Sequence, residues 1–416
     1  MEETASNLEG REINQLADLP LMKEAEPLAA MRILSSVTAF AYQTIPQTFL
    51  LIILKQMNLS LKHGNSSLSA FTYITYGLIL CGIINNIESG YKFGELAKKI
   101  VSKSPSQEVT VKVLETFNHL IRPWKEHIKD TLNSFLKVYS VAQKTGNLEF
   151  AGYSLYGYSY TAYLSGKELA ELKLKITSHS SSLKQMKQEN AFQWYQMCLQ
   201  TVSNLSDIFV NTFTLIGEAY NEEEMLAFHI DKNDIMGLLF IYFFKLHLCY
   251  LFGHFSEALK NSEIAKQYLH AGIGNVIYAQ FYFYDSLTCL GLYPQVSDPE
   301  RKDFLERIAA NQEKIKHWSN HAPMNFLHKF NLVEAEKYNV LEKKIKAMEF
   351  YDLAIAGAKE NKYIHEEALA NELAAKFYLK WDKLRIAKAY LNDAYYGYLR
   401  WGAKTKVKDL QKRYPQ

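Results

Sequence analysis

The chain has 416 residues, of which 48% are hydrophobic and 22% charged, and its formal net charge at pH 7 is +3. This composition excludes a disordered chain, and the nearly balanced charge gives no global field that would favour nucleic acid. Four cysteines stand far apart in apolar runs and predict buried free thiols in a reducing, cytoplasmic compartment: Cys81, Cys198, Cys249 and Cys289.

The N-terminal residues 1–25 are polar, and the sequence predicts a flexible segment there. The stretch has an acidic start and lacks the basic and then apolar pattern of a secretory signal. From residue 26 to residue 416 we expect one continuous α-helical repeat, because no alternation typical of strands occurs. The clearest predicted helical hairpins cover residues 69–103, 236–271, 324–362 and 364–402.

A stripe of tyrosines follows the turn at residues 145–147. Its members are spaced three and four residues apart, which places them on one face of a helix: Tyr153, Tyr156, Tyr160 and Tyr163. The stripe could line a groove for a ligand or peptide, although packing between neighbouring hairpins explains it as well. Gly152 and Gly157 in the same segment imitate a phosphate-binding loop, but Tyr158 stands where that loop needs lysine.

Residues 178–235 show a weaker period, with helices predicted around 189–205 and 207–220. The apolar run from Met236 to Phe252 is interrupted by Lys245 and His247, so we expect a buried helix and no membrane span.

Two stretches near the C-terminus repeat each other at a spacing of 40 residues. Small and aromatic residues recur in the same order, which is the pattern of closely crossing helices: Ala335, Tyr338, Ala347, Phe350, Ala354 and Gly357 match Ala375, Tyr378, Ala387, Tyr390, Ala394 and Gly397. The repeat predicts an all-α, tetratricopeptide-like solenoid of stacked antiparallel helical hairpins.

Few residue patterns indicate chemistry. Glu313, His317 and His321 share a helical face, yet they lack the His-Glu-x-x-His order, and His321 precedes a helix-breaking proline. The basic C-terminal helix is a weak signal for nucleic acid. We therefore expect no catalytic residues, no metal and no cofactor, and a protein that is not an enzyme.

Several blocks of the sequence resemble a known family. They are residues 366–379 (EEALANELAAKFYL), 395–403 (YYGYLRWGA), 407–410 (VKDL) and 414–415 (YP), with shorter blocks at 27–34, 76–82, 216–220, 284–287 and 321–325. Together they are similar to the helical-repeat region of large multidomain bacterial signalling proteins, abundant in cyanobacteria. Those proteins also carry a Ser/Thr kinase-like domain, an AAA ATPase, a GAF domain and a sensor histidine kinase.

The resemblance implies a non-catalytic scaffold and sensing module that couples flanking ATPase and sensor-kinase modules. Partners would be protein domains or peptides bound on a long curved surface. The kinase and ATPase motifs of the family lie outside these residues, so no such activity is assigned to any of them. The alternative is a stand-alone adaptor, made by a truncated or split gene, that binds a partner protein in trans.

Overall fold

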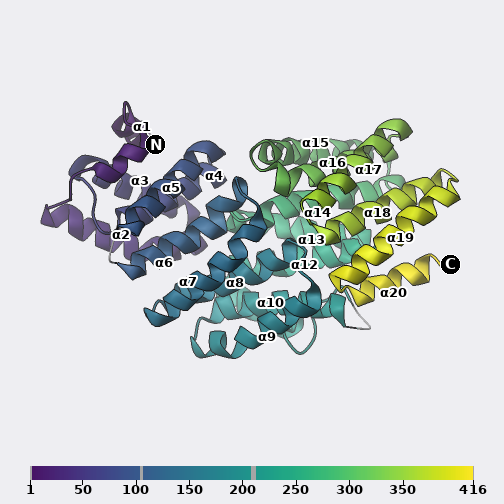
Figure 1. The fold of residues 1–416 in the computed structure, drawn as a ribbon, viewed down its shortest axis with the longest axis horizontal. Coiled ribbons are helices and arrows are strands. Elements are labelled where there is room, and N and C mark those ends of the chain that lie inside the picture. The colour runs from purple at the N-terminus through teal and green to yellow at the C-terminus, as the bar shows by residue number, and fades with distance from the viewer. Residues whose placement is uncertain (1, 104–105, 208–211, 416) are drawn as a thin grey trace.

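The computed structural model describes residues 2–103, 106–207 and 212–415. In these ranges the regular structure is helical, with α1 to α20 in chain order, short 3-10 and π turns and no strand beyond two isolated β-bridges. Figure 1 shows the N-terminal helices at one end of the molecule and α19 and α20 at the other. The predicted all-α class with stacked helical pairs is confirmed.

The helices of the N-terminal half are α1 (Glu2–Leu8), α2 (Ala25–Thr44), α3 (Pro46–His63), α4 (Ser69–Gly82), α5 (Ile87–Ser102), α6 (Gln107–Thr116), α7 (Leu132–Lys144), α8 (Leu148–Leu164), α9 (Leu169–Gln185) and α10 (Glu189–Ser206). Those of the C-terminal half are α11 (Glu222–Asp231), α12 (Ile235–Leu251), α13 (Phe255–Tyr268), α14 (Ile277–Leu292), α15 (Asp298–His321), α16 (Pro323–Val340), α17 (Lys344–Glu360), α18 (Ile364–Lys380), α19 (Leu384–Trp401) and α20 (Lys404–Arg413). The pairs α4/α5, α12/α13, α16/α17 and α18/α19 coincide with the four clearest predicted hairpins.

The helices form an inner and an outer row. Inner helices such as α8, α12 and α14 are buried on almost every side, whereas α17 and α19 bury one narrow face. Apolar residues all round a helix match burial all round it. The run from Met236 to Phe252 accordingly forms α12 in the interior, and no helix of the described ranges is long and apolar enough to cross a bilayer.

The 40-residue repeat is visible as repeated geometry. The rings of Tyr338 and Phe350 stack with centroids 5.4 Å apart, and those of Tyr378 and Tyr390 stack at 5.3 Å. The repeated alanines are fully buried where paired helices cross. Backbone conformations also recur: positive φ occurs at Glu342 and Asp382, and at Lys362 and Gly402. Each pair is 40 residues apart, so the turns repeat as well as the helices.

Successive turns of the superhelix contact each other across large sequence separations. Asn325 at the start of α16 donates to the carbonyls of Pro123 and Glu126 at 2.7 and 2.8 Å. The Trp124 indole donates to the carbonyl of Gly274 at 2.8 Å. Because of these contacts, the inner helices pack against one another and do not line the open curved surface that the sequence suggests.

The N-terminal segment differs from the predicted flexible stretch. Residues 2–8 form α1 and residues 13–18 a 3-10 helix, and both pack against the first hairpins. Leu16 is 1% exposed, and the Asn7 amide donates to the Asn58 side chain at 3.0 Å. A few buried groups therefore hold a segment whose composition is polar.

The predicted helix at 207–220 is wrong over residues 212–220, while residues 208–211 lie outside the described part. This segment is a loop held by two buried amides of α10. The Asn204 side chain donates to the carbonyls of Thr212 and Thr214, and the Gln200 carbonyl accepts from the backbone of Ala219. These side chains replace the backbone hydrogen bonds that a helix would have supplied.

Candidate functional site

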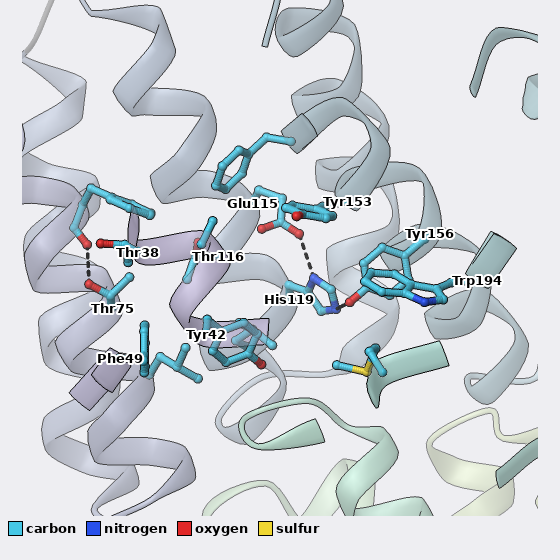
Figure 2. A pocket seen from close by; sticks show the side chains of 16 residues that line it. Thr38, Tyr42, Phe49, Thr75, Glu115, Thr116, His119, Tyr153, Tyr156 and Trp194 are labelled. Atoms are coloured by element: carbon cyan, nitrogen blue, oxygen red, sulfur yellow. Dashed lines mark hydrogen bonds and ion pairs between the residues drawn. The ribbon is translucent and has the colours of Figure 1, made fainter. Parts of the chain in front are cut away.

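A cavity of about 70 Å³ lies where α2, α4, α6, α8 and α10 converge (Figure 2). Its wall is largely aromatic, with the rings of Phe71, Tyr156 and Trp194 among the lining side chains. Ala39, Tyr42 and Tyr153 are half-buried and form its rim between α2 and α8. The cavity is therefore lined mainly by apolar side chains.

A π-helical turn brings a carboxylate and an imidazole to the cavity wall. Helix α6 passes at its C-terminal end into a turn of π-helix, Phe117–Ile121. Glu115 precedes this turn and His119 lies within it, so the two side chains point the same way. Turns of this kind are frequent at functional sites.

The two groups begin a buried relay of hydrogen bonds. Glu115 Oε1 lies 2.7 Å from His119 Nδ1, and His119 Nε2 lies 3.1 Å from the Tyr156 hydroxyl and 3.3 Å from the Asn275 amide nitrogen. An amide nitrogen can only donate, so Nε2 is an acceptor and the proton resides on Nδ1. The imidazole therefore accepts at Nε2 and donates from Nδ1 to Glu115 Oε1.

The Glu115 carboxylate has one oxygen to spare. The residue is 3% exposed, and Oε1 is occupied by His119. Among the described residues, Oε2 has no hydrogen-bond partner. Oε2 is therefore a carboxylate oxygen at the cavity wall that accepts no hydrogen bond from a described residue.

The structure divides the predicted tyrosine stripe into two parts. Tyr153 and Tyr156 line the cavity, whereas Tyr160 and Tyr163 lie deeper between inner helices. The Tyr163 hydroxyl is 3.0 Å from His247 Nδ1. Burial raises the pKa of Tyr156, Tyr160 and Tyr163 well above the ordinary value, so all three remain neutral phenols that can donate a proton to a hydrogen bond.

The glycines of the same segment serve packing. A Cβ on Gly157 would lie 2.8 Å from the Phe135 ring, and one on Gly152 would lie 3.1 Å from the Ala191 Cβ. Both glycines are helical and allow neighbouring helices to approach α8.

The other histidine pattern, on α15, lies apart from the cavity. His321 Nδ1 is 3.2 Å from the Glu88 carboxylate on α5, and the His317 and His321 ring centroids are 5.0 Å apart. The described ranges contain no group of three or more His, Cys, Asp and Glu residues placed to hold a metal ion.

Sequence reasoning missed Glu115, His119 and Trp194. The available signal was a glutamate and a histidine four residues apart in the otherwise apolar face of residues 109–121. That spacing is common on helices, so it becomes informative only when α8 and α10 close around it.

A second buried polar cluster joins the C-terminal hairpins. The Glu366 carboxylate on α18 contacts Lys329 Nζ at 2.6 Å and also the His328 ring, both on α16. Burial alone would raise the pKa of Glu366, but the charge of Lys329 and the hydrogen bond with His328 outweigh it and hold that pKa far below the ordinary value. The cluster is a satisfied ion pair that fixes α16 against α18.

Comparison with known proteins found one partial similarity in sequence. No family model matches the chain. A stretch of 58 residues is 41% identical to a protein of Dictyostelium discoideum named hybrid signal transduction histidine kinase G. The match covers 14% of this chain and 2% of the Dictyostelium protein.

Proposed function

We propose that this chain is a non-catalytic helical-repeat module of a signal-transduction kinase, which couples protein domains bound at different parts of its surface. The observation that supports it most is the set of contacts between distant turns. Asn325, Trp124 and their partners join segments 150 or more residues apart. These contacts are the route by which we propose that a displacement of one hairpin reaches the others. The partial similarity to a histidine kinase agrees with a signalling context.

The expected partners are an ATPase module and a sensor-kinase module of the bacterial class that the sequence resembles. Their contact surface would be the outer row of helices. Helix α19 exposes Leu384 and Tyr396, which are 62% and 58% exposed. Apolar side chains at this exposure are available for burial by a partner domain.

Binding of the purified chain to the isolated ATPase and sensor-kinase modules, measured by calorimetry, tests the proposal. We expect binding of at least one module, and a loss of about tenfold in affinity or more for the double variant L384S/Y396S. The control is I33S, which removes a side chain of similar exposure on α2 at the opposite end of the molecule. An equal loss in both variants, or binding of neither module, contradicts the proposal.

The adaptor alternative predicts a different outcome from the same material. An adaptor would capture a partner protein in trans while binding neither module. An enzyme would turn over a substrate without any partner, and catalysis by the chain alone would end both scaffold proposals.

A further inference from the structure

The unmatched oxygen of Glu115 identifies what the cavity can bind. A carboxylate oxygen on a residue that is 3% exposed, with no protein donor, calls for a ligand that supplies an N–H or O–H group. A cationic donor makes the stronger hydrogen bond to a carboxylate, so a protonated amine fits this oxygen best. His119 gives no compensating charge, because its Nε2 accepts from Asn275 and its single proton is already directed at Oε1.

Lys112 on α6 pairs with a carboxylate outside the cavity lining. Lys112 Nζ lies 2.8 Å from the Glu108 carboxylate, on the outer side of α6. It also lies 5.9 and 6.0 Å from the ring centroids of Phe71 and Phe150. No lysine or arginine is among the described residues that line the cavity, so Glu115 has no cationic partner there.

The aromatic wall favours a cation with small apolar groups. The Tyr156 and Trp194 rings meet edge to face with centroids 5.0 Å apart, and Tyr153 lies parallel to Trp194 at 6.5 Å. The faces of such rings attract ammonium groups while their carbon surfaces contact alkyl groups. A cavity of about 70 Å³ is roughly half of one known to hold benzene, so the bound group must be smaller than a benzene ring.

We propose that this cavity binds a small protonated alkylamine, whose N–H donates to Glu115 Oε2 and whose alkyl group lies among Phe71, Tyr156 and Trp194. This site is separate from the outer surface assigned to partner domains. Amine binding can therefore be tested independently of the scaffold role.

Calorimetry of the full chain with two matched probes tests the charge requirement. Isopropylammonium and 2-propanol have nearly the same shape and both donate hydrogen bonds, but only the first is a cation. We expect isopropylammonium to bind with a Kd near or below about 1 mM, and 2-propanol to bind at least about tenfold more weakly. Sodium chloride at the same ionic strength corrects for general screening.

The residue assignment is tested with variants that keep the size of the side chain. E115Q removes the charge, and we expect at least about a tenfold loss of affinity for isopropylammonium. The matched control is E108Q on the same helix, an exposed carboxylate outside the cavity wall, which should bind within about twofold of the unmodified chain.

A second pair of variants covers the case in which E115Q does not fold. A39F places a ring at the rim and should abolish binding, whereas A29F adds the same ring to an exposed position of α2 and should not. Equal binding of the two probes, unchanged affinity in E115Q or A39F, or no binding of isopropylammonium to the unmodified chain would each overturn the proposal.

Discussion

Three of the buried histidines have a pKa well below the ordinary value. His247 on α12, His328 on α16 and His365 on α18 are each 5% exposed or less. Burial lowers the pKa of His247 and His365 to about 3 and that of His328 to about 4. Each is therefore a neutral ring in the folded protein at physiological pH. Its burial reduces the free energy of unfolding only when the solution is acidic enough to protonate histidines in the unfolded chain.

The stability of the fold should fall as the pH falls below about 6.5, the ordinary histidine pKa. In the unfolded chain His247 takes up a proton near that pH, whereas in the folded protein burial and the neighbouring His365 hold its pKa near 3. Between these values the unfolded state binds more protons, so the free energy of unfolding decreases with acidity. We expect H247Q to reduce this decrease by up to about 1.4 kcal/mol per pH unit, measured by urea denaturation at several pH values.

The Tyr163 hydroxyl provides the matched control for that measurement. Y163F removes the hydrogen bond between Tyr163 and His247 Nδ1 but leaves the histidine in place. Its stability should be lower at every pH, with the same pH dependence as the unmodified chain. A slope that H247Q leaves unchanged would show that the ring does not control the acid response.

The burial of some of these residues could be predicted from the sequence, and that of others could not. His247 was visible because it interrupts an apolar run, which correctly predicted a buried helix without a membrane span. Glu115 and His119 looked like any helical pair, since their burial depends on α8 and α10, which lie far away in the chain. Composition and spacing report on one helix, whereas a cavity is a property of several.

At the scale of elements, the paired helices cross where their side chains are smallest. Gly397 on α19 faces Ala368 on α18, and a Cβ at Gly397 would lie 2.7 Å from the Ala368 Cβ. At the equivalent crossing, a Cβ at Gly357 on α17 would lie 3.2 Å from the His328 Cβ. The same repeat position therefore has less room for a side chain at Gly397 than at Gly357.

Substituting alanine at these two glycines should separate packing from helix propensity. Alanine gains up to about 1 kcal/mol in a helix at either position. In G397A the close contact forces α18 and α19 apart, and we expect a net destabilisation of about 1–2 kcal/mol. In G357A the neighbour needs to move only a few tenths of an ångström, so stability should stay within about 1 kcal/mol of the unmodified chain. Equal effects on the thermal midpoint would contradict this difference between the crossings.

Element prediction succeeded where the pattern was local and failed where it was not. Each copy of the 40-residue repeat contains the helices, turns and crossing residues of one hairpin. The last two hairpins could therefore be predicted from the sequence. Residues 212–220 had a plausible helical pattern, but Asn204 and Gln200 from the preceding helix hold them as a loop. The sequence of residues 212–220 alone does not indicate that their hydrogen-bond partners are side chains of α10.

At the scale of the whole molecule, one amide joins three parts of the chain. Asn325 donates to the carbonyls of Pro123 and Glu126, and its oxygen accepts from the Ile128 amide at 3.2 Å and the Tyr363 hydroxyl at 2.8 Å. All of its hydrogen-bonding capacity is used, at 1% exposure. This residue links the segment after α6 to α16 and α18, and repeat periodicity could not have predicted the junction.

Replacing Asn325 with alanine tests whether the turns of the superhelix act as one body. N325A leaves four polar groups without this partner, three of them in buried hydrogen bonds. Because each buried group costs about 1–3 kcal/mol without full additivity, we expect a loss of at least about 3 kcal/mol. The control is N371A, which is equally buried but donates only to the Glu367 carbonyl one turn earlier in its own helix, and which should cost about 1 kcal/mol. Amide hydrogen exchange should become faster in residues 122–131 of N325A and stay unchanged there in N371A, because only the first variant releases that segment from α16. Similar losses and similar exchange in both variants would mean that the contacts between turns follow from the stacking of the hairpins and do not themselves transmit force between them.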